Sequence, residues 1–71
     1  MIIVGDIVLY RTRRSDAAPD TWLPAIVVRK NADGSLLLHV FSDAPDPFTG
    51  ATSFLLDDVT LGPEPGQWRH R

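Results

Sequence analysis

Two short runs of apolar residues, joined by a polar turn, stand out between Leu23 and Phe41. The first run is Ala25-Ile26-Val27-Val28, and the second is Leu36-Leu37-Leu38-His39-Val40-Phe41. Ile and Val have a restricted first side-chain torsion and suit a pleated surface, so both runs favour strand over helix. Asp33-Gly34 between them is typical of a hairpin turn, because glycine accepts a positive φ. The pattern predicts a β-hairpin over residues 23–41.

Successive side chains in a strand point to opposite faces of the sheet, which assigns each residue of these runs to a face. In the second run we expect Leu36, Leu38 and Val40 to point inward and Leu37, His39 and Phe41 to point outward. In the first run Ala25 and Val27 share one face, and Ile26 and Val28 share the other. We expect an earlier strand over residues 2–10. In it Asp6, Val8 and Tyr10 should lie on one face, and Ile7 and Leu9 on the other.

The rest of the chain predicts loops and two further short strands. Residues 11–22 and 42–50 have no periodic apolar face, so we expect long loops there, and two prolines exclude a helix from the second. Residues 52–56 and 59–61 predict strands separated by a turn at Asp57-Asp58, followed by a stiff connector over 62–66. Five short strands without a helix predict an all-β fold, a small closed or half-open barrel. We expect one domain over residues 1–68 and a frayed tail over 69–71.

Composition narrows the class of protein. The 71 residues, 44% of them hydrophobic, suit one small globular domain rather than a disordered segment. There is no cysteine, so neither disulfides nor thiolate metal sites are available. Secreted domains this small usually need such cross-links, and the first residues lack the positive region of a signal peptide. No apolar run approaches the ~20 residues of a membrane span. We therefore expect an intracellular or virion location without membrane contact.

The charges are unevenly distributed, although the net charge is only -2. Arg11, Arg13, Arg14, Arg29 and Lys30 lie in the first half of the chain, and Arg69 and Arg71 at its end. No lysine or arginine lies between Lys30 and Arg69, where most of the acidic residues are found. The loops in the middle of the chain should therefore repel phosphate groups.

Residues that carry catalytic or metal chemistry are sparse. A nucleophile needs a base within hydrogen-bond reach and a group that orients that base. The only histidines are His39, in a predicted strand, and His70, in the predicted tail. The acidic pairs Asp43/Asp46 and Asp57/Asp58 fit turn chemistry better than a Ca²⁺ loop. We therefore expect no enzyme activity, no bound metal and no cofactor.

Three motifs resemble the Src-homology-3-like small barrels of the KOW and Tudor type: Gly5-Asp6-Ile7-Val8-Leu9-Tyr10, Pro24-Ala25-Ile26-Val27-Val28 and Asn31-Ala32-Asp33-Gly34-Ser35-Leu36. With Val40-Phe41 and Pro65-Gly66-Gln67-Trp68 added, the pattern is similar to a group of small bacteriophage and prophage proteins of mostly unassigned function. The resemblance implies a five-stranded barrel in the virion or the host cytoplasm. The signalling domains of this fold bind proline-rich peptides through an Ala-Leu-Tyr-Asp-Tyr strand, a tryptophan pair and a Pro-Tyr, which this chain lacks. The resemblance therefore does not imply binding of proline-rich peptides.

A protein partner, or self-association, is the function that these observations favour. Leu37 and Phe41 on the outer face, with Phe48, Phe54 and Trp68 nearby, exceed what a small barrel needs inside. A continuous outer apolar patch marks an interface, and an edge strand can accept a strand from a partner. We therefore expect a non-enzymatic phage-type adaptor or virion accessory protein, with Trp22, Leu37, Phe41, Phe48 and Trp68 as interface candidates. The alternative is that the loop 42–50 and the C-terminal segment fold over this face.

A nucleic-acid-binding barrel is the second hypothesis, and it would use Arg11, Arg13 and Arg14 with Trp22. Stacking of a base on an aromatic ring contributes about 1–3 kcal/mol where it occurs. In antiparallel strands, however, these arginines and the Arg29-Lys30 pair lie at opposite ends of the barrel. They would not form the single basic stripe that follows a phosphate backbone.

Overall fold

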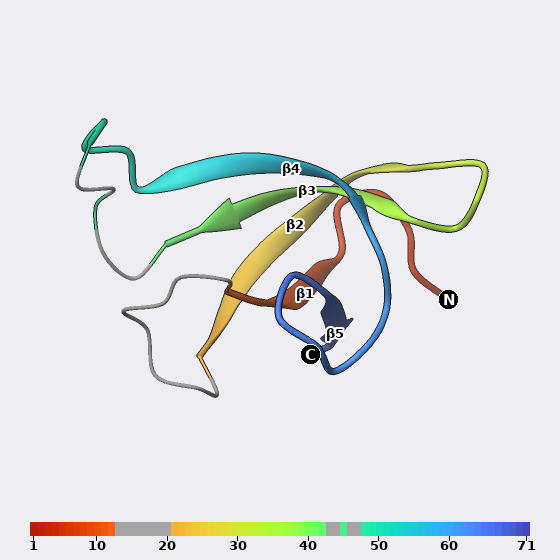
Figure 1. Ribbon diagram of the computed structural model, residues 1–71. Coiled ribbons are helices and arrows are strands. Elements are labelled where there is room, and N and C mark those ends of the chain that lie inside the picture. The colour runs from red at the N-terminus through yellow and green to blue at the C-terminus, as the bar shows by residue number, and fades with distance from the viewer. Residues whose placement is uncertain (13–20, 43–44, 46–47) are drawn as a thin grey trace.

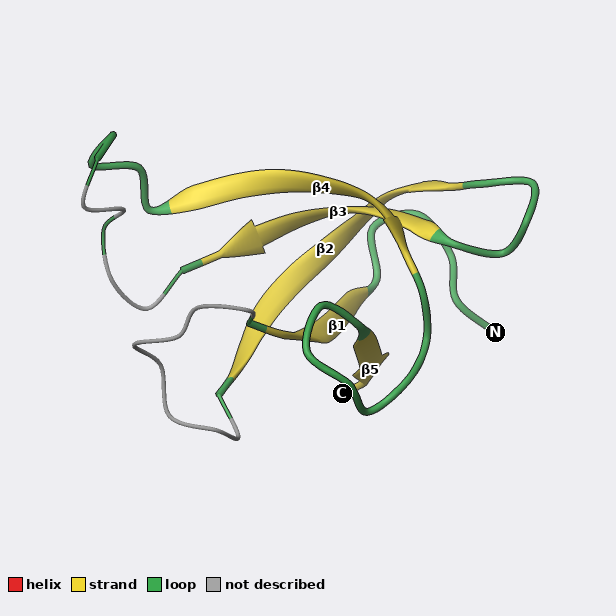
Figure 2. Ribbon diagram, viewed as in Figure 1, coloured by secondary structure: helices red, strands yellow, loops and turns green. Residues whose placement is uncertain are grey.

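The computed structural model describes residues 1–12, 21–42, 45 and 48–71, and these form one five-stranded antiparallel sheet (Figures 1 and 2). The strands are β1 (Ile7–Arg11), β2 (Trp22–Lys30), β3 (Leu36–Phe41), β4 (Ser53–Val59) and β5 (Trp68–His70). Their order in the sheet is β4-β3-β2-β1-β5, and the described residues contain no helix. The all-β prediction is confirmed.

The predicted hairpin is present as β2 and β3. Ala25 pairs with Val40 and Val27 with Leu38, and the turn between the strands holds Gly34 at φ 91°. The Gly34 amide donates to the Asn31 carbonyl oxygen at 3.0 Å, and the Asn31 amide donates to the Ser35 carbonyl oxygen at 2.9 Å. A residue with a Cβ is strained at such a positive φ, which explains the glycine at this position.

The buried core lies on one face of the curled sheet, and the predicted alternation of faces is confirmed. In β3 the burial alternates along the strand, with Leu36, Leu38 and Val40 buried and Leu37 and His39 half-buried. In β1, Val8 and Tyr10 are buried while Ile7 is exposed. The core consists of the following buried side chains, which come from all five strands: Val8, Tyr10, Leu23, Ala25, Val27, Leu36, Leu38, Val40, Val59 and Trp68.

The predictions for the last third of the chain are partly wrong. Asp57 and Asp58 do not reverse the chain but lie within β4, which extends to Val59. Asp58 has φ 56°, a conformation that aspartate tolerates, and the pairing of β4 with β3 shifts register beside it, between Leu36 and Leu38. The two aspartates therefore form an irregularity within a strand and not a turn between two strands.

The last strand is not 59–61 but β5, and the predicted frayed tail begins too early. Arg69 pairs with Leu9 and His70 with Val8, so β5 adds to the free side of β1. Beyond the end of β4, Leu61 makes an isolated parallel bridge to Trp68. The Trp68 amide donates to the Thr60 carbonyl oxygen at 3.0 Å, and the Gly62 amide donates to the Trp68 carbonyl oxygen at 3.0 Å. The sheet is otherwise not closed.

Parts of the two long loops predicted from the sequence lie outside the described residues, namely 13–20 of the first loop and 43–44 and 46–47 of the second. At the ends of the first loop, Arg11 belongs to β1 and Trp22 to β2, and the two residues pair with each other.

Candidate functional site

The face of the sheet opposite the core carries a row of mostly apolar side chains across four strands. Ile7 of β1 pairs with Ile26 of β2, Ile26 pairs with His39 of β3, and His39 pairs with Leu55 of β4. Because paired residues project from the same face of a sheet, these four side chains form one row. Leu55 is 61% exposed and Ile7 is 39% exposed, whereas Ile26 and His39 are half-buried.

A second row lies beside the first. Leu9 of β1 pairs with Pro24 of β2. Phe41 of β3 pairs with Ser53 of β4, the next pair after His39–Leu55 on the same face of the sheet. The rings of Phe41 and His39 are stacked with their centroids 4.9 Å apart, which joins the two rows. We define the outer face by the residues of both rows and the half-buried or exposed apolar side chains next to them, namely Ile7, Leu9, Pro24, Ile26, Val28, Leu37, His39, Phe41 and Leu55.

One end of the outer face is bordered by two arginines and a tryptophan. Arg11 and Trp22 pair at the end of the β1–β2 ladder, and the Arg69 guanidinium lies over the Trp22 ring, 4.1 Å from its centroid. Arg11 Nη1 donates to the Pro63 carbonyl oxygen at 2.6 Å. This contact fixes the arginine against the connector that leads to β5. The border is therefore cationic, and the face of its aromatic ring is covered by a cation.

The opposite end carries a polar network centred on Asn31, which holds the hairpin turn against β4. Asn31 Nδ2 donates to Asp57 Oδ1 at 2.8 Å and to Ser35 Oγ at 3.0 Å. Arg29 donates to Asn31 Oδ1 at 2.9 Å and forms an ion pair with Asp57 at 2.6 Å. The Arg29–Asp57 pair is about half exposed, so the pair itself contributes little to stability. The network places β4 relative to the turn.

Hydrogen bonds lower the pKa values of both carboxylates in this region. The pKa of Asp33 lies below its usual 3.8, mainly because its carboxylate accepts from the Ser35 hydroxyl, at 2.7 Å, and from the Ser35 amide. The pKa of Asp57 lies below its usual 3.8 mainly because it accepts from Asn31, with the Asp58 amide as the next cause. Both groups are therefore ionised at neutral pH and serve as acceptors within the fold.

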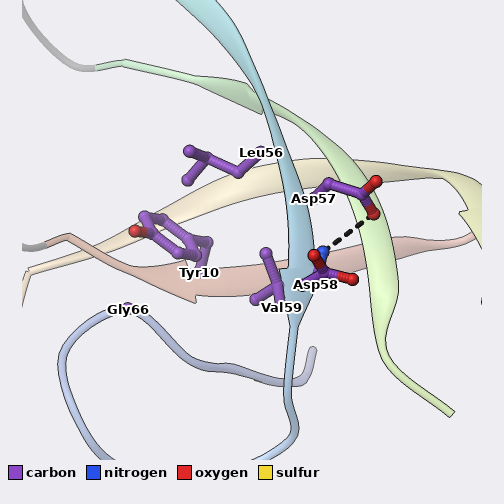
Figure 3. A pocket seen from close by; sticks show the side chains of 6 residues that line it. All are labelled: Tyr10, Leu56, Asp57, Asp58, Val59 and Gly66. Atoms are coloured by element: carbon purple, nitrogen blue, oxygen red, sulfur yellow. Dashed lines mark hydrogen bonds between the residues drawn. The ribbon is translucent and has the colours of Figure 1, made fainter. Parts of the chain in front are cut away.

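A shallow pocket lies where β4 approaches β1 and the connector before β5, on the side where the sheet is not closed (Figure 3). It is lined by Tyr10, Leu56, Asp57, Asp58, Val59 and Gly66 and has a volume of about 120 Å³. Ligand pockets usually measure ~300–1,000 Å³, so this one is too small for a typical organic substrate. Its one hydrogen-bonded carboxylate, Asp57, already accepts from Arg29, Asn31 and the Asp58 amide. Within the described part of the chain, no group of three or more His, Cys, Asp or Glu side chains could hold a metal ion.

The structure separates the predicted interface residues. Leu37 and Phe41 lie on the outer face, as expected, and Trp22 lies at its cationic border. Phe48 is 94% exposed but lies in the turn before β4, outside the two rows. Trp68 was expected to be available to a partner, and this is wrong, because only 5% of it is exposed and it packs into the core.

Other positions also differ from the sequence-based expectation. Phe54 pairs with buried Val40 and makes an edge contact with the Tyr10 ring, so it lies on the core side of β4. The sequence did not identify Leu55 as an interface candidate, although 61% of it is exposed on the outer face. Its alternation with Phe54 predicts that the two face opposite ways, but only the register with β3 shows which one is outside. Arg11 lies at the opposite end of β2 from Arg29 and Lys30, as predicted, whereas Arg13 and Arg14 fall outside the described residues.

Comparisons of the chain with protein-family models, with curated proteins and with solved structures found no match. A search of the described residues for a helix long and apolar enough to cross a membrane found none. The outer face and its two polar ends are therefore the features from which a function is inferred.

Proposed function

We propose that this chain is a non-enzymatic docking protein, and that its outer face binds another protein. The observation that carries the proposal is the row Ile7–Ile26–His39–Leu55, which keeps apolar side chains exposed on the side of the sheet that the core does not use. Monomeric soluble proteins rarely expose contiguous apolar patches larger than a few hundred Å², and larger patches mark interaction sites.

The composition of the outer face suits such a role. A standard interface covers about 800 Å² on each partner, which is about a sixth of the 4694 Å² accessible surface of this chain. Interface centres are apolar and aromatic with a polar rim, and here Phe41 and Leu55 are flanked by Arg11 and Arg69 at one end and by Arg29 at the other. Burial of apolar surface contributes roughly 25 cal/mol per Å², so the exposed parts of these side chains would supply most of the affinity.

We also propose that the fold is a half-open Src-homology-3-like barrel from a bacteriophage or prophage, acting as an adaptor or virion accessory protein. The motifs around Gly5-Asp6 and Asp33-Gly34 support this, as does the pairing of the last strand with the first. The isolated bridge between Leu61, which follows β4, and Trp68 of β5 also supports a half-open barrel. The genomic neighbourhood tests this assignment: head or tail genes beside the coding sequence support a virion component. A neighbourhood without phage genes would contradict it.

Site-specific photocrosslinking tests the docking proposal. A benzophenone amino acid at Phe41 should cross-link one defined protein in a phage or host lysate, and Phe41→Lys should reduce its recovery in a pull-down at least tenfold. Leu61→Lys is the matched control, because Leu61 is 58% exposed and lies outside the outer face. Equal capture by both lysine variants, or cross-linking no different from a probe placed at Leu61, would contradict docking through this face.

Nucleic-acid binding is the second candidate, favoured by the cluster of Arg11, Trp22 and Arg69 at one end of the sheet. The Arg69 guanidinium already covers one face of the Trp22 ring, which leaves less of it for a base. Titration of single-stranded DNA and RNA at low salt tests this candidate. Binding whose salt dependence flattens when Arg11, Arg13 and Arg14 are replaced with alanine would support it. The absence of binding at low salt would dismiss it.

A further inference from the structure

The edge formed by β4 offers a second interaction surface, which meets the outer face at Leu55. β4 is at the end of the sheet order, and among the described residues only β3 pairs with it (Figure 1). At the other end of the sheet, β5 has only three residues and is bridged by Leu61. Within the part of the chain that the structure describes, the long unpaired edge is therefore on β4.

The register shows which main-chain groups point away from β3. The Ser42 amide donates to the Thr52 carbonyl oxygen at 2.8 Å, so Ser42 and Thr52 form a hydrogen-bonded pair. Hydrogen-bonded and non-hydrogen-bonded pairs alternate along an antiparallel ladder. The pairs Phe41–Ser53 and His39–Leu55 are therefore of the non-hydrogen-bonded kind. The amide and carbonyl groups of Ser53 and Leu55 consequently point outward, toward the open edge.

The first four residues of this edge lack the devices by which proteins usually prevent strand addition. Residues 53–56 read Ser-Phe-Leu-Leu, without a charge, a proline or a glycine. Phe54 is 38% exposed on one side and Leu55 is 61% exposed on the other. The irregular pairing and the two aspartates come only at 57–58, at the far end of the strand. The first four residues of β4 are therefore open to a partner strand.

We propose that a second copy of this chain pairs with β4 in antiparallel fashion about a two-fold axis at Leu55, which joins the two sheets into one. In this register Leu55 faces Leu55 of the other copy, Phe54 faces Leu56, and Ser53 faces Asp57. Outward-pointing backbone groups then meet each other, as a ladder requires. The most exposed leucine of the outer face is buried against its symmetry mate.

Charge favours this register for a second copy. Asp57 falls opposite the neutral Ser53 and Asp58 opposite Thr52, so no two aspartates face each other, whereas a register centred on 57 or 58 would place aspartates together. The pairing uses the strand edge and leaves Ile7, Ile26 and Phe41 uncovered. It therefore goes beyond the proposed docking function and does not depend on it.

Opposite charges introduced at Leu55, on the two-fold axis, test the proposal. The readout is the sedimenting mass, measured by sedimentation velocity over a range of concentrations. The wild-type chain, of 7.9 kDa, should sediment with twice that mass at high concentration. Leu55→Lys and Leu55→Glu should each weaken dimerisation at least tenfold, because like charges face each other across the axis. An equimolar mixture of the two variants should restore the dimer, because opposite charges then meet.

Two further variants separate the edge from the outer face. Ser53→Pro should also give a monomer, because it removes an outward amide without breaking a hydrogen bond to β3. Ile7→Lys should still dimerise, because Ile7 lies on β1, away from the edge. A wild type that stays monomeric at the highest soluble concentration, a mixture that does not dimerise, or loss of the dimer in Ile7→Lys would each overturn the proposal. Circular dichroism of every variant checks that it is folded, and crosslinking at Phe41 stays an independent test of docking.

Discussion

Replacing Leu38 with alanine should destabilise the fold far more than the same replacement at its neighbour, Leu37. Leu38 is fully buried in β3, between Val27 of β2 and Leu56 of β4. Leu37 precedes it in the chain but is half-buried on the outer face. The two variants lose the same atoms from adjacent residues, so their difference measures the alternation of faces alone.

The expected magnitudes follow from this burial. Truncating a fully buried leucine costs about 2–5 kcal/mol, because the lost contacts leave a cavity in the core. At roughly 0.05–0.15 kcal/mol per residue, a 71-residue domain has a total stability of only about 4–10 kcal/mol. Leu38→Ala should therefore remove a large part of the stability, whereas Leu37→Ala, at a partly solvated position, should cost about 1 kcal/mol.

Urea denaturation followed by tryptophan fluorescence is a suitable assay, because Trp68 is buried in the core. The midpoint of Leu38→Ala should fall well below that of Leu37→Ala, with a similar slope, and its melting temperature should drop by about 10 °C or more. Measurements at low protein concentration keep self-association out of the comparison. Equal destabilisation by the two variants would refute the assignment of inner and outer faces on which the outer face depends.

Three further predictions concern the turn and its network. Asn31→Ala should lower the free energy of unfolding by about 1–2 kcal/mol in urea denaturation, because the Asn31 side chain bonds to Ser35, Asp57 and Arg29; no change would show that the network is dispensable. Because the folded pKa values of Asp33 and Asp57 are lowered, their contribution to stability should be complete above the unfolded pKa near 3.8 and be lost as pH falls through the folded values. Asp57→Asn should make this acid decline in the urea midpoint shallower, and an unchanged decline would contradict a role for Asp57. Gly34→Ala should cost about 1 kcal/mol by the same assay, because φ is 91° there, and an unchanged midpoint would argue against a left-handed turn residue.

The parts of the fold that local patterns determine could be predicted from the sequence. β2 contains the run Ile26-Val27-Val28 and β3 the run Leu36-Leu37-Leu38, on either side of a glycine turn, so both their existence and their faces follow from short-range rules. β5 could not be found in this way, because Trp68–His70 is short, follows a connector rich in proline and glycine, and becomes a strand only through pairing with β1. Tertiary pairing, rather than propensity, makes it a strand.

The candidate site was predictable only in part, for a related reason. Leu37 and Phe41 follow from alternation within one strand, but the row they border is assembled from four strands whose registers no local pattern reveals. Asp57 was assigned to a turn because aspartate is typical of turns. The Arg29 and Asn31 that hold it in β4 lie far from it in sequence. Trp68 was assigned to the surface because the sequence does not show that its strand covers the core.

The pairing of β5 with β1 has a consequence for synthesis on the ribosome. Leu9 and its partner Arg69 lie far apart in the sequence, so one side of β1 stays without its hydrogen bonds until the residues between them and β5 have been translated. Ordering the long intervening segment before this contact forms carries an entropic cost that slows the final step. A nascent chain that stops before residue 68 would leave β1 as an unprotected edge, available to neighbouring chains and to proteases.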